Sequence, residues 1–185
     1  MPAYSRDDLK LFTAEENGEV SDRPMRSVID ANIRDFHQAI DEEQWDTAKI
    51  YLSEDAKLVE RLDRPGSIYN GANSVIQYYK DSRDAHERTV IKALVVDRGR
   101  AFCGLESFWI ETHDKSEAAT KAASEFRRMR KVCIFDVDAK YLVKRIEFRD
   151  TDQEIITIGG GLKEMRDAVR ESKKDVVVME ENFGF

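Results

Sequence analysis

The sequence predicts an α+β fold in which three helices come first and cover a curved antiparallel sheet. The first observation is helical spacing, because apolar residues recur three or four positions apart over 25–40. The second is a change to runs rich in β-branched and aromatic residues, at 89–97, 100–111, 126–136 and 140–150. The third is the short links between these runs, which favour antiparallel neighbours. Helices followed by a strand meander are typical of the α+β class.

The N-terminal part supplies the helices. The first helical stripe consists of Met25, Val28, Ile29, Ile33, Phe36 and Ile40. After an acidic break at 41–43, a second stripe consists of Trp45, Ala48, Tyr51 and Leu52. Residues 57–61 then predict a short strand and Arg64-Pro65-Gly66 a turn. Asn73-Ser74 predicts the cap of a third helix, which carries Val75, Ile76 and Tyr79.

The four later runs predict the sheet. Arg98-Gly99 joins the first two, and a glycine there suits a tight hairpin turn because it accepts a positive φ. The three residues 137–139 join the last two runs. Neither link is long enough for a crossover helix, so we expect a meander of adjacent strands.

Both ends of the chain extend beyond this pattern. We predict an N-terminal arm over 1–23, one domain over 24–150 and a C-terminal extension over 151–185. The extension includes a short strand at 154–158, a hinge at Gly159-Gly160-Gly161 and an amphipathic helix. Its final residues, VVVMEENFGF, are suited to docking on their own domain or on a neighbouring chain.

Composition and charge exclude several classes of function. The net charge of −7 argues against general nucleic-acid binding, which needs a basic face. No apolar run reaches the ~20 residues that span a bilayer, and the N-terminus lacks a secretory signal. We therefore expect a cytoplasmic protein with free thiols at Cys103 and Cys133. No metal-ligand spacing or cofactor motif is present, so we expect neither a metal nor a cofactor.

Several short motifs occur in a characteristic order. They are Asp41-Glu42-Glu43-Gln44-Trp45-Asp46, Leu52-Ser53-Glu54-Asp55-Ala56, Tyr69-Asn70-Gly71 and Phe148-Arg149-Asp150. In this order they resemble the nuclear transport factor 2-like superfamily, in its SnoaL-like and ketosteroid isomerase-like branch. The resemblance covers about 24–150 and implies a cone of curved sheet and three helices around an apolar cavity. It is more specific for fold than for activity.

Three acids are candidates for acid/base catalysis, since burial in such a cavity raises the pKa of a carboxylic acid towards neutrality. The resemblance places the carboxylate base of ketosteroid isomerase-like enzymes at Glu60. Glu106 is a lone charge in a row with Phe102, Gly104, Phe108 and Ile110. Glu147 lies near the last-strand carboxylate of limonene-epoxide-hydrolase-like members. Phe36, Tyr51 and Trp109 are expected to shape the cavity.

Each acid also has a structural interpretation. A glutamate at a strand end, such as Glu60, is more often solvated. Both faces of the Glu106 strand are apolar, which predicts a homodimer through the sheet. If the Glu106 row faces that interface, the acid pairs with a basic residue and has no catalytic part. The resemblance also fails in places, because Phe36 stands where related enzymes carry a tyrosine donor and Lys131 stands near their protonated aspartate. The sequence therefore does not predict a steroid isomerase.

Two hypotheses of function remain. One is a cofactor-independent enzyme, of isomerase, cyclase, dehydratase or epoxide hydrolase type, acting on a small apolar metabolite. The other is a non-catalytic module of the same fold that binds a small ligand or dimerises. They differ in where the acids lie, because the enzyme hypothesis expects Glu60 and Glu106 to share one closed cavity.

Overall fold

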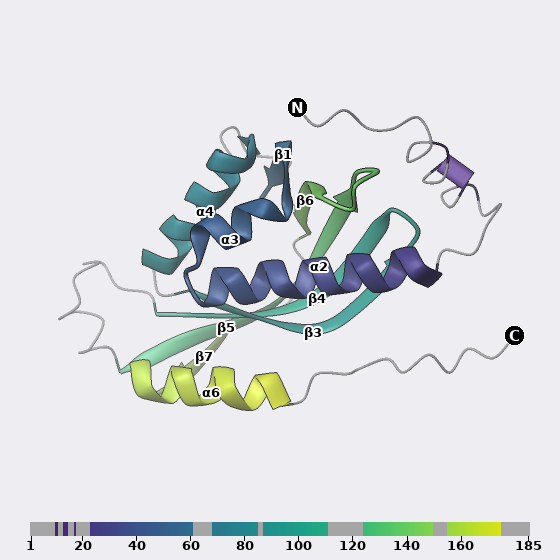
Figure 1. The fold of residues 1–185 in the computed structure, drawn as a ribbon. Helices are drawn as coiled ribbons and strands as arrows, with labels where there is room; N and C mark the ends of the chain where they lie inside the picture. Colours follow the sequence, from purple (N-terminus) through teal and green to yellow (C-terminus); the bar gives the residue numbers. More distant parts are fainter. Residues whose placement is uncertain are drawn as a thin grey trace, which may run out of the picture.

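The structure is a computed structural model that describes residues 10, 13, 14, 17, 23–60, 68–84, 87–110, 124–149 and 155–174. Helices α2 (Arg23–Asp41), α3 (Trp45–Ile50) and α4 (Ala72–Asp84) lie on one side of a seven-stranded sheet. A further helix, α6 (Leu162–Lys174), lies apart from them beneath the sheet (Figure 1). None of the helices in these ranges is long and apolar enough to cross a membrane.

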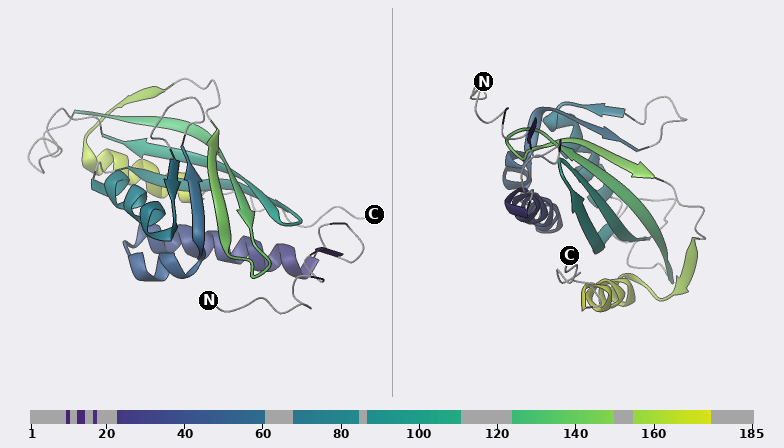
Figure 2. Two further views of the ribbon diagram at one scale, coloured as in Figure 1. Left: turned by 90° about the horizontal axis from the view of Figure 1, so that it is seen from above. Right: turned by 90° about the vertical axis from the view of Figure 1, so that its right-hand side faces the viewer.

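The sheet is curved, as its two further views show (Figure 2). Its strands are β1 (Leu52–Val59), β2 (Ile68–Asn70), β3 (Arg88–Asp97), β4 (Arg100–Trp109), β5 (Glu125–Val137), β6 (Val143–Arg149) and β7 (Ile156–Gly159). The order is β2-β1-β6-β5-β4-β3, and β7 pairs with β5. The predicted meander from β3 to β6 is confirmed. One pair, β1 with β6, is parallel, so the sheet is mixed.

Two element boundaries differ from the sequence prediction near the helices. Strand β1 begins at Leu52, which helical spacing had assigned to the second helix, because Leu52 pairs with Val143 of β6. Helix α4 begins at Ala72 rather than after Asn73-Ser74. Its first turn is closed by the N–H of Val75, which donates to the carbonyl of Gly71 at 3.1 Å. Gly71 has a φ of 86°, a value that glycine adopts without strain.

The link between β5 and β6 is also longer than the three residues predicted. The side chain of Asp138 accepts hydrogen bonds from the N–H groups of Lys140 and Leu142, at 2.8 and 3.1 Å. Tyr141 has a φ of 60° in the same turn. The aspartate thus organises a turn over residues that alternation alone had assigned to the strand.

The main core lies between the inner face of the sheet and the helices. The first helical stripe is confirmed at Met25, Ile29, Ile33, Phe36 and Ile40, which are all buried, and is wrong at Val28, which is exposed. They meet buried residues of the sheet, among them Leu58, Leu105, Cys133, Phe135 and Ile146. Because side chains alternate along a strand, the odd-numbered residues of β4 and β5 face this core.

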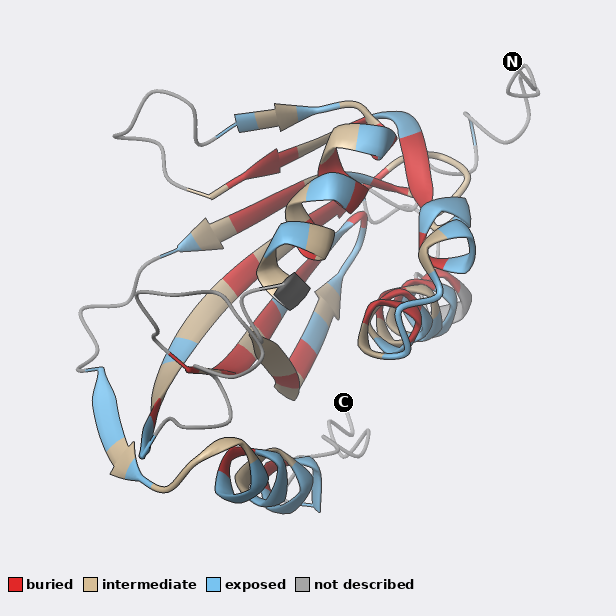
Figure 3. Cartoon of the chain, turned by 90° about the vertical axis from the view of Figure 1, so that its left-hand side faces the viewer, coloured by how far each residue is buried: buried red, intermediate tan, exposed pale blue. Residues whose placement is uncertain are grey.

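The even-numbered residues of β4 and β5 form the outer face of the sheet, and α6 covers part of it. Met165 of α6 packs on Phe108, Phe126 and Val90 in a second apolar cluster. Most of the remaining helix surface is exposed (Figure 3). The second apolar face, from which the sequence predicts a homodimer, is therefore partly covered by the chain itself. The predicted arm and the residues after Lys174 lie almost wholly outside the described ranges.

Candidate ligand-binding site

A hollow opens on the inner side of the sheet, between α2, α4 and strands β3 to β6. It holds about 450 Å³ of space not filled by protein atoms, including its open mouth. The centres of water-sized molecules reach only about 30 Å³ of it, so the hollow is narrow. The side chains that give it chemical character are His37, Tyr78, Tyr79, Glu87, Ser107 and Lys131.

Aromatic packing positions the helical side chains around the hollow. The His37 ring on α2 lies edge-on to Phe36 and Phe135, with ring centres 5.6 and 5.8 Å apart. On α4, Tyr79 lies edge-on to Phe36 at 5.5 Å. Its neighbour Tyr78 packs on two other aromatic rings of the cone, those of Tyr69 and Phe148. The edge-to-face contacts of His37 and Tyr79 hold these two rings in defined orientations.

The hydroxyl of Tyr79 is the most unusual polar group in the hollow. Its oxygen is buried and has no hydrogen-bond partner among the residues that the structure describes. Burial raises the pKa of Tyr79 well above its ordinary value, so the hydroxyl stays protonated and can donate. Buried polar groups are almost always hydrogen-bonded, and none of the described residues supplies that bond to Tyr79.

A charged pair lies opposite, at the sheet. Lys131 of β5 donates from Nζ to Glu87 Oε1 at 3.0 Å, and both side chains are largely buried. The same Nζ lies 6.0 Å from the centre of the Phe148 ring. Lys131 thus brings a cation to the hollow.

Glu60 lies at the edge of this site. It follows the last residue of β1 and is half-buried. The hydroxyl of Tyr78, which lines the hollow, lies 3.5 Å from Glu60 Oε1 and is placed to donate to it. Burial raises the pKa of Tyr78, and the negative charges of Glu87 and Glu60 raise it further. Of the three predicted acids, Glu60 is thus the one connected to the hollow.

Glu106 lies on the opposite face of the sheet. Its neighbour Ser107 lines the hollow, so alternation turns Glu106 away, towards α6. Ser172 Oγ of α6 donates to Glu106 Oε2 at 2.5 Å, and Arg128 Nε donates to Oε1 at 2.7 Å. Burial alone would raise the pKa of Glu106, but the hydrogen bonds from Ser172 and Arg128 and the nearby charges outweigh it and lower that pKa. The surroundings therefore favour the ionised form.

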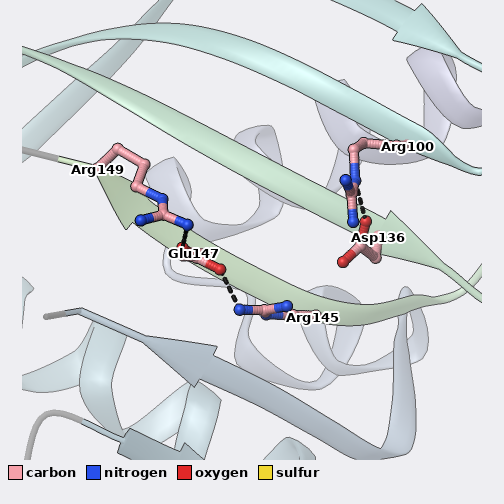
Figure 4. Close-up of polar contacts among 5 residues, drawn as sticks. All are labelled: Arg100, Asp136, Arg145, Glu147 and Arg149. Carbon is pink, nitrogen blue, oxygen red and sulfur yellow. Dashed lines mark hydrogen bonds and ion pairs between the residues drawn. The ribbon is translucent and has the colours of Figure 1, made fainter. Parts of the chain in front are cut away.

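Glu147 is also on the outer face. It is buried on β6 between Arg145 and Arg149, which both pair with its carboxylate (Figure 4). On the neighbouring strands, Arg100 Nε donates to Asp136 Oδ1 at 2.6 Å. Glu147 and Glu106 are thus both held by arginines, and the structure does not bring either of them together with Glu60.

The three residues expected to shape the cavity lie elsewhere. Phe36 is fully buried in the core, where its ring supports Tyr79 from behind. Tyr51 caps α3, and its hydroxyl lies 3.5 Å from Asp35 Oδ2. Trp109 ends β4 opposite Arg127. Sequence reasoning missed Tyr78 and Tyr79 because their positions depend on how α4 is rotated against the sheet, and it missed Glu87 because that residue lies between α4 and β3.

The candidate site has no cluster typical of metal binding. In the described ranges, no group of three or more histidine, cysteine, aspartate or glutamate side chains is placed to hold a metal ion.

Comparison with solved structures identifies the fold of this chain. The sequence matches no protein-family model and no curated protein. Solved structures do match: an NTF2-like protein from Burkholderia xenovorans LB400 superposes with a TM-score of 0.53 at 12% identity, over 67% of this chain and 89% of that one. This chain has the nuclear transport factor 2-like fold.

Two further structures with this fold have a described activity or ligand. One is the epoxide hydrolase/cyclase-like enzyme SalBIII, which has a role in pyran ring formation in the polyether salinomycin. It superposes with a TM-score of 0.57 at 11% identity, over 72% of this chain and 95% of that one. The other is a Mycobacterium tuberculosis protein in complex with estradiol-17beta-hemisuccinate. It superposes with a TM-score of 0.54 at 9% identity, over 70% of this chain and 98% of that one. At these identities the likeness extends to the nuclear transport factor 2-like fold and no further.

Proposed function

We propose that the chain binds a small, mostly apolar molecule in the hollow and holds it by a hydrogen bond from Tyr79. The observation that carries this proposal is the buried Tyr79 hydroxyl, which lacks a hydrogen-bond partner among the described residues and belongs to a side chain that lines the hollow. A polar group left unpaired in an apolar surrounding costs about 1–3 kcal/mol. A ligand that accepts a hydrogen bond from Tyr79 removes that cost.

The other residues of the hollow suggest the chemistry of this ligand. Aromatic side chains on α2 and α4 suit a flat or cyclic apolar body, while Lys131 and Glu87 offer a second polar contact. A protein of the same fold binds a steroid ester, which has this combination of apolar rings and polar ends. Because the hollow is narrow, we expect side chains lining it to move when a ligand of that size enters.

The test compares Tyr79→Phe with the native chain, using estradiol-17beta-hemisuccinate as the probe and calorimetry to measure affinity. We expect native binding and a roughly fivefold to tenfold weaker affinity in Tyr79→Phe, since one neutral hydrogen bond contributes about 1 kcal/mol. Tyr69→Phe is the matched control, because Tyr69 packs on Tyr78 without lining the hollow. Equal affinity in all three chains would contradict the role of Tyr79.

The probe need not match the natural ligand, so a second measurement addresses the site directly. A crystal structure of the protein as purified should show density within hydrogen-bond distance of Tyr79 Oη. A hollow that has closed around Tyr79, with its hydroxyl bonded to the protein, would overturn the proposal even if the probe binds elsewhere.

An acid/base enzyme is the second candidate, and the contact between Tyr78 and Glu60 favours it. Glu60 is placed to act on a ligand in the hollow through the Tyr78 hydroxyl. Deuterium uptake from D₂O next to the carbonyl of 2-cyclohexenone, followed by NMR, measures such proton transfer. We expect uptake above the buffer rate that Glu60→Gln abolishes and Glu54→Gln, an exposed control on β1, preserves. Uptake at the buffer rate would exclude this activity for a simple ketone.

Two sequence predictions stay predictions. The homodimer through the sheet is supported by Val95 and Phe102, which are apolar and exposed on the outer face. Sedimentation at micromolar concentration should give twice the chain mass if that dimer forms. The cytoplasmic location is checked by fractionation of the source cells.

A further inference from the structure

On the outer face of the sheet, the described residues leave an apolar area partly exposed directly beyond Lys174, where α6 ends. Strand register places two rows side by side: Val95, Phe102 and Ile134 in one, and Ala93, Gly104 and Val132 in the next. We call these six residues the outer patch. Val95 and Phe102 are 43% and 42% exposed, and the other four are half-buried. Apolar residues gathered in this way usually have a partner.

Arginines border the outer patch on the β6 side. Ile134 pairs in register with Glu147, and Val132 pairs with Arg149. Glu147 is buried between Arg145 and Arg149, whose own side chains are 40% and 51% exposed (Figure 4). Arg100 and Asp136 lie at the end of the patch. Although the whole chain carries −7, the border thus has three partly exposed arginines against two largely buried acids.

Helix α6 leads the chain towards the outer patch. Its last turn is held at the boundary of the patch by Ser172, which donates to Glu106 and accepts from Lys92 Nζ at 2.6 Å. Glu106 lies one outer-face position along β4 from Gly104 of the patch. The chain leaves α6 at Lys174, two residues after this anchored serine.

The residues after Lys174 include apolar and acidic side chains, which suit the apolar outer patch and the arginines at its border. They read DVVVMEENFGF over 175–185, an apolar run followed by two glutamates and two phenylalanines. An extended chain advances about 3.3 Å per residue, so six residues span roughly 20 Å. The three strand spacings from β3 to β6 amount to roughly 15 Å. Val176 to Met179 can therefore lie on the outer patch while Glu180 and Glu181 reach the arginines of β6.

We propose that the segment 175–185 docks on the outer patch of its own chain. The apolar run covers Val95 and Phe102, and the glutamates pair with Arg145 and Arg149. Helix α6 and the segment after it then cover the outer face in succession, and this arrangement occupies the surface that a sheet-mediated homodimer would use. The proposal is independent of ligand binding in the hollow, which lies on the opposite face.

Amide hydrogen exchange of the full chain, followed by mass spectrometry, tests this docking. We expect the amides of 176–179 to exchange at least tenfold more slowly than in a synthetic peptide of residues 175–185. The double variant Val176→Asp with Val178→Asp should restore the peptide rate without affecting the fold, because α6 ends before these positions. Phe102→Glu, which changes the outer patch itself, should also restore the peptide rate of exchange. Ile50→Glu, an exposed apolar control on α3, should leave exchange of 176–179 as slow as in the native chain.

Charge-reversal variants and sedimentation give two further tests of this docking. Reversal of Glu180 and Glu181 to lysine should reduce the protection severalfold at low salt and less at high salt. Exchange of 176–179 at the peptide rate in the native chain would overturn the proposal. Protection that rises with protein concentration, together with twice the chain mass in sedimentation, would show instead that a second copy covers the patch.

Discussion

Glutamate side chains have different partners on the two faces of this sheet. Glu106 and Glu147 are buried on the outer face and each is held by two arginines. Buried charges need such partners, because an unpaired carboxylate would change its protonation state or destabilise the fold. Glu60 on the inner side has a tyrosine hydroxyl as its described partner. Of these three acids, Glu60 is therefore the one best placed to meet a ligand in the hollow.

Glu106→Gln should destabilise the protein by about 1–3 kcal/mol at pH 7, because a hydrogen-bonded charge is lost. The folded protein lowers the pKa of Glu106 below its ordinary 4.5, so the stabilisation is complete above that value and is lost as the pH falls through the folded pKa. Arg128, Arg130, Lys92 and Ser172 face the carboxylate throughout.

Urea unfolding at pH 7 and at pH 3 measures this dependence. The difference between native and Glu106→Gln chains should shrink at pH 3. Glu171→Gln, which changes an exposed glutamate on α6, is the matched control and should leave the unfolding free energy within about 0.5 kcal/mol. A constant difference between native and Glu106→Gln chains across this pH range would contradict the role given to ionisation.

The two cysteines should be chemically inert in the folded protein. Cys103 and Cys133 are adjacent in register on β4 and β5, and both are free and fully buried. Burial raises the pKa of Cys103 to about 12 and raises that of Cys133 further above its ordinary value. Because the thiolate is the reactive species, a thiol reagent such as DTNB at pH 8 should label neither cysteine before unfolding. Rapid labelling of the native chain would show that the strands open locally.

Among the elements, α6 differs from the other helices because it belongs to a separate apolar cluster. The stripe of α2 packs into the main core, whereas Met165 anchors α6 to Phe108 and Phe126 on the outer face. Elements with fewer buried contacts open at lower free energy than the core does. We therefore expect α6 to detach while the cone remains folded.

Met165→Ala tests this independence of α6. Removing a buried methionine side chain costs about 2–5 kcal/mol, and here the loss falls on one helix. Amide exchange in α6 should accelerate more than tenfold while exchange in β4 and β5 stays near the native rate. Arg166→Ala, an exposed neighbour, should change neither. Equal acceleration in the strands and in α6 would show that the helix and the cone unfold as one unit.

At the scale of the whole molecule, sequence reasoning predicted the architecture better than the site. Hydrophobic period and short links are local signals, and they predicted the meander from β3 to β6 and the helix with Met25, Ile33 and Phe36. The parallel pairing of β1 with β6 depends on residues 91 positions apart, Leu52 and Val143, and no local pattern encodes it. Tyr79 and Lys131 lie on α4 and β5 and line one hollow only after α4 packs on the sheet, so no local pattern predicts them as neighbours.

The parallel pair of β1 and β6 also affects how the protein is made. Val59 of β1 pairs with Glu147 of β6, so β1 is synthesised well before its long-range partner exists. At roughly 5–20 residues per second, the ribosome needs roughly 4–18 s to add residues 60–147. Until then, one side of β1 lacks its neighbour on the nascent chain. Cotranslational folding of this protein should therefore finish late, and its early intermediates should expose the edge of β1 that later pairs with β6.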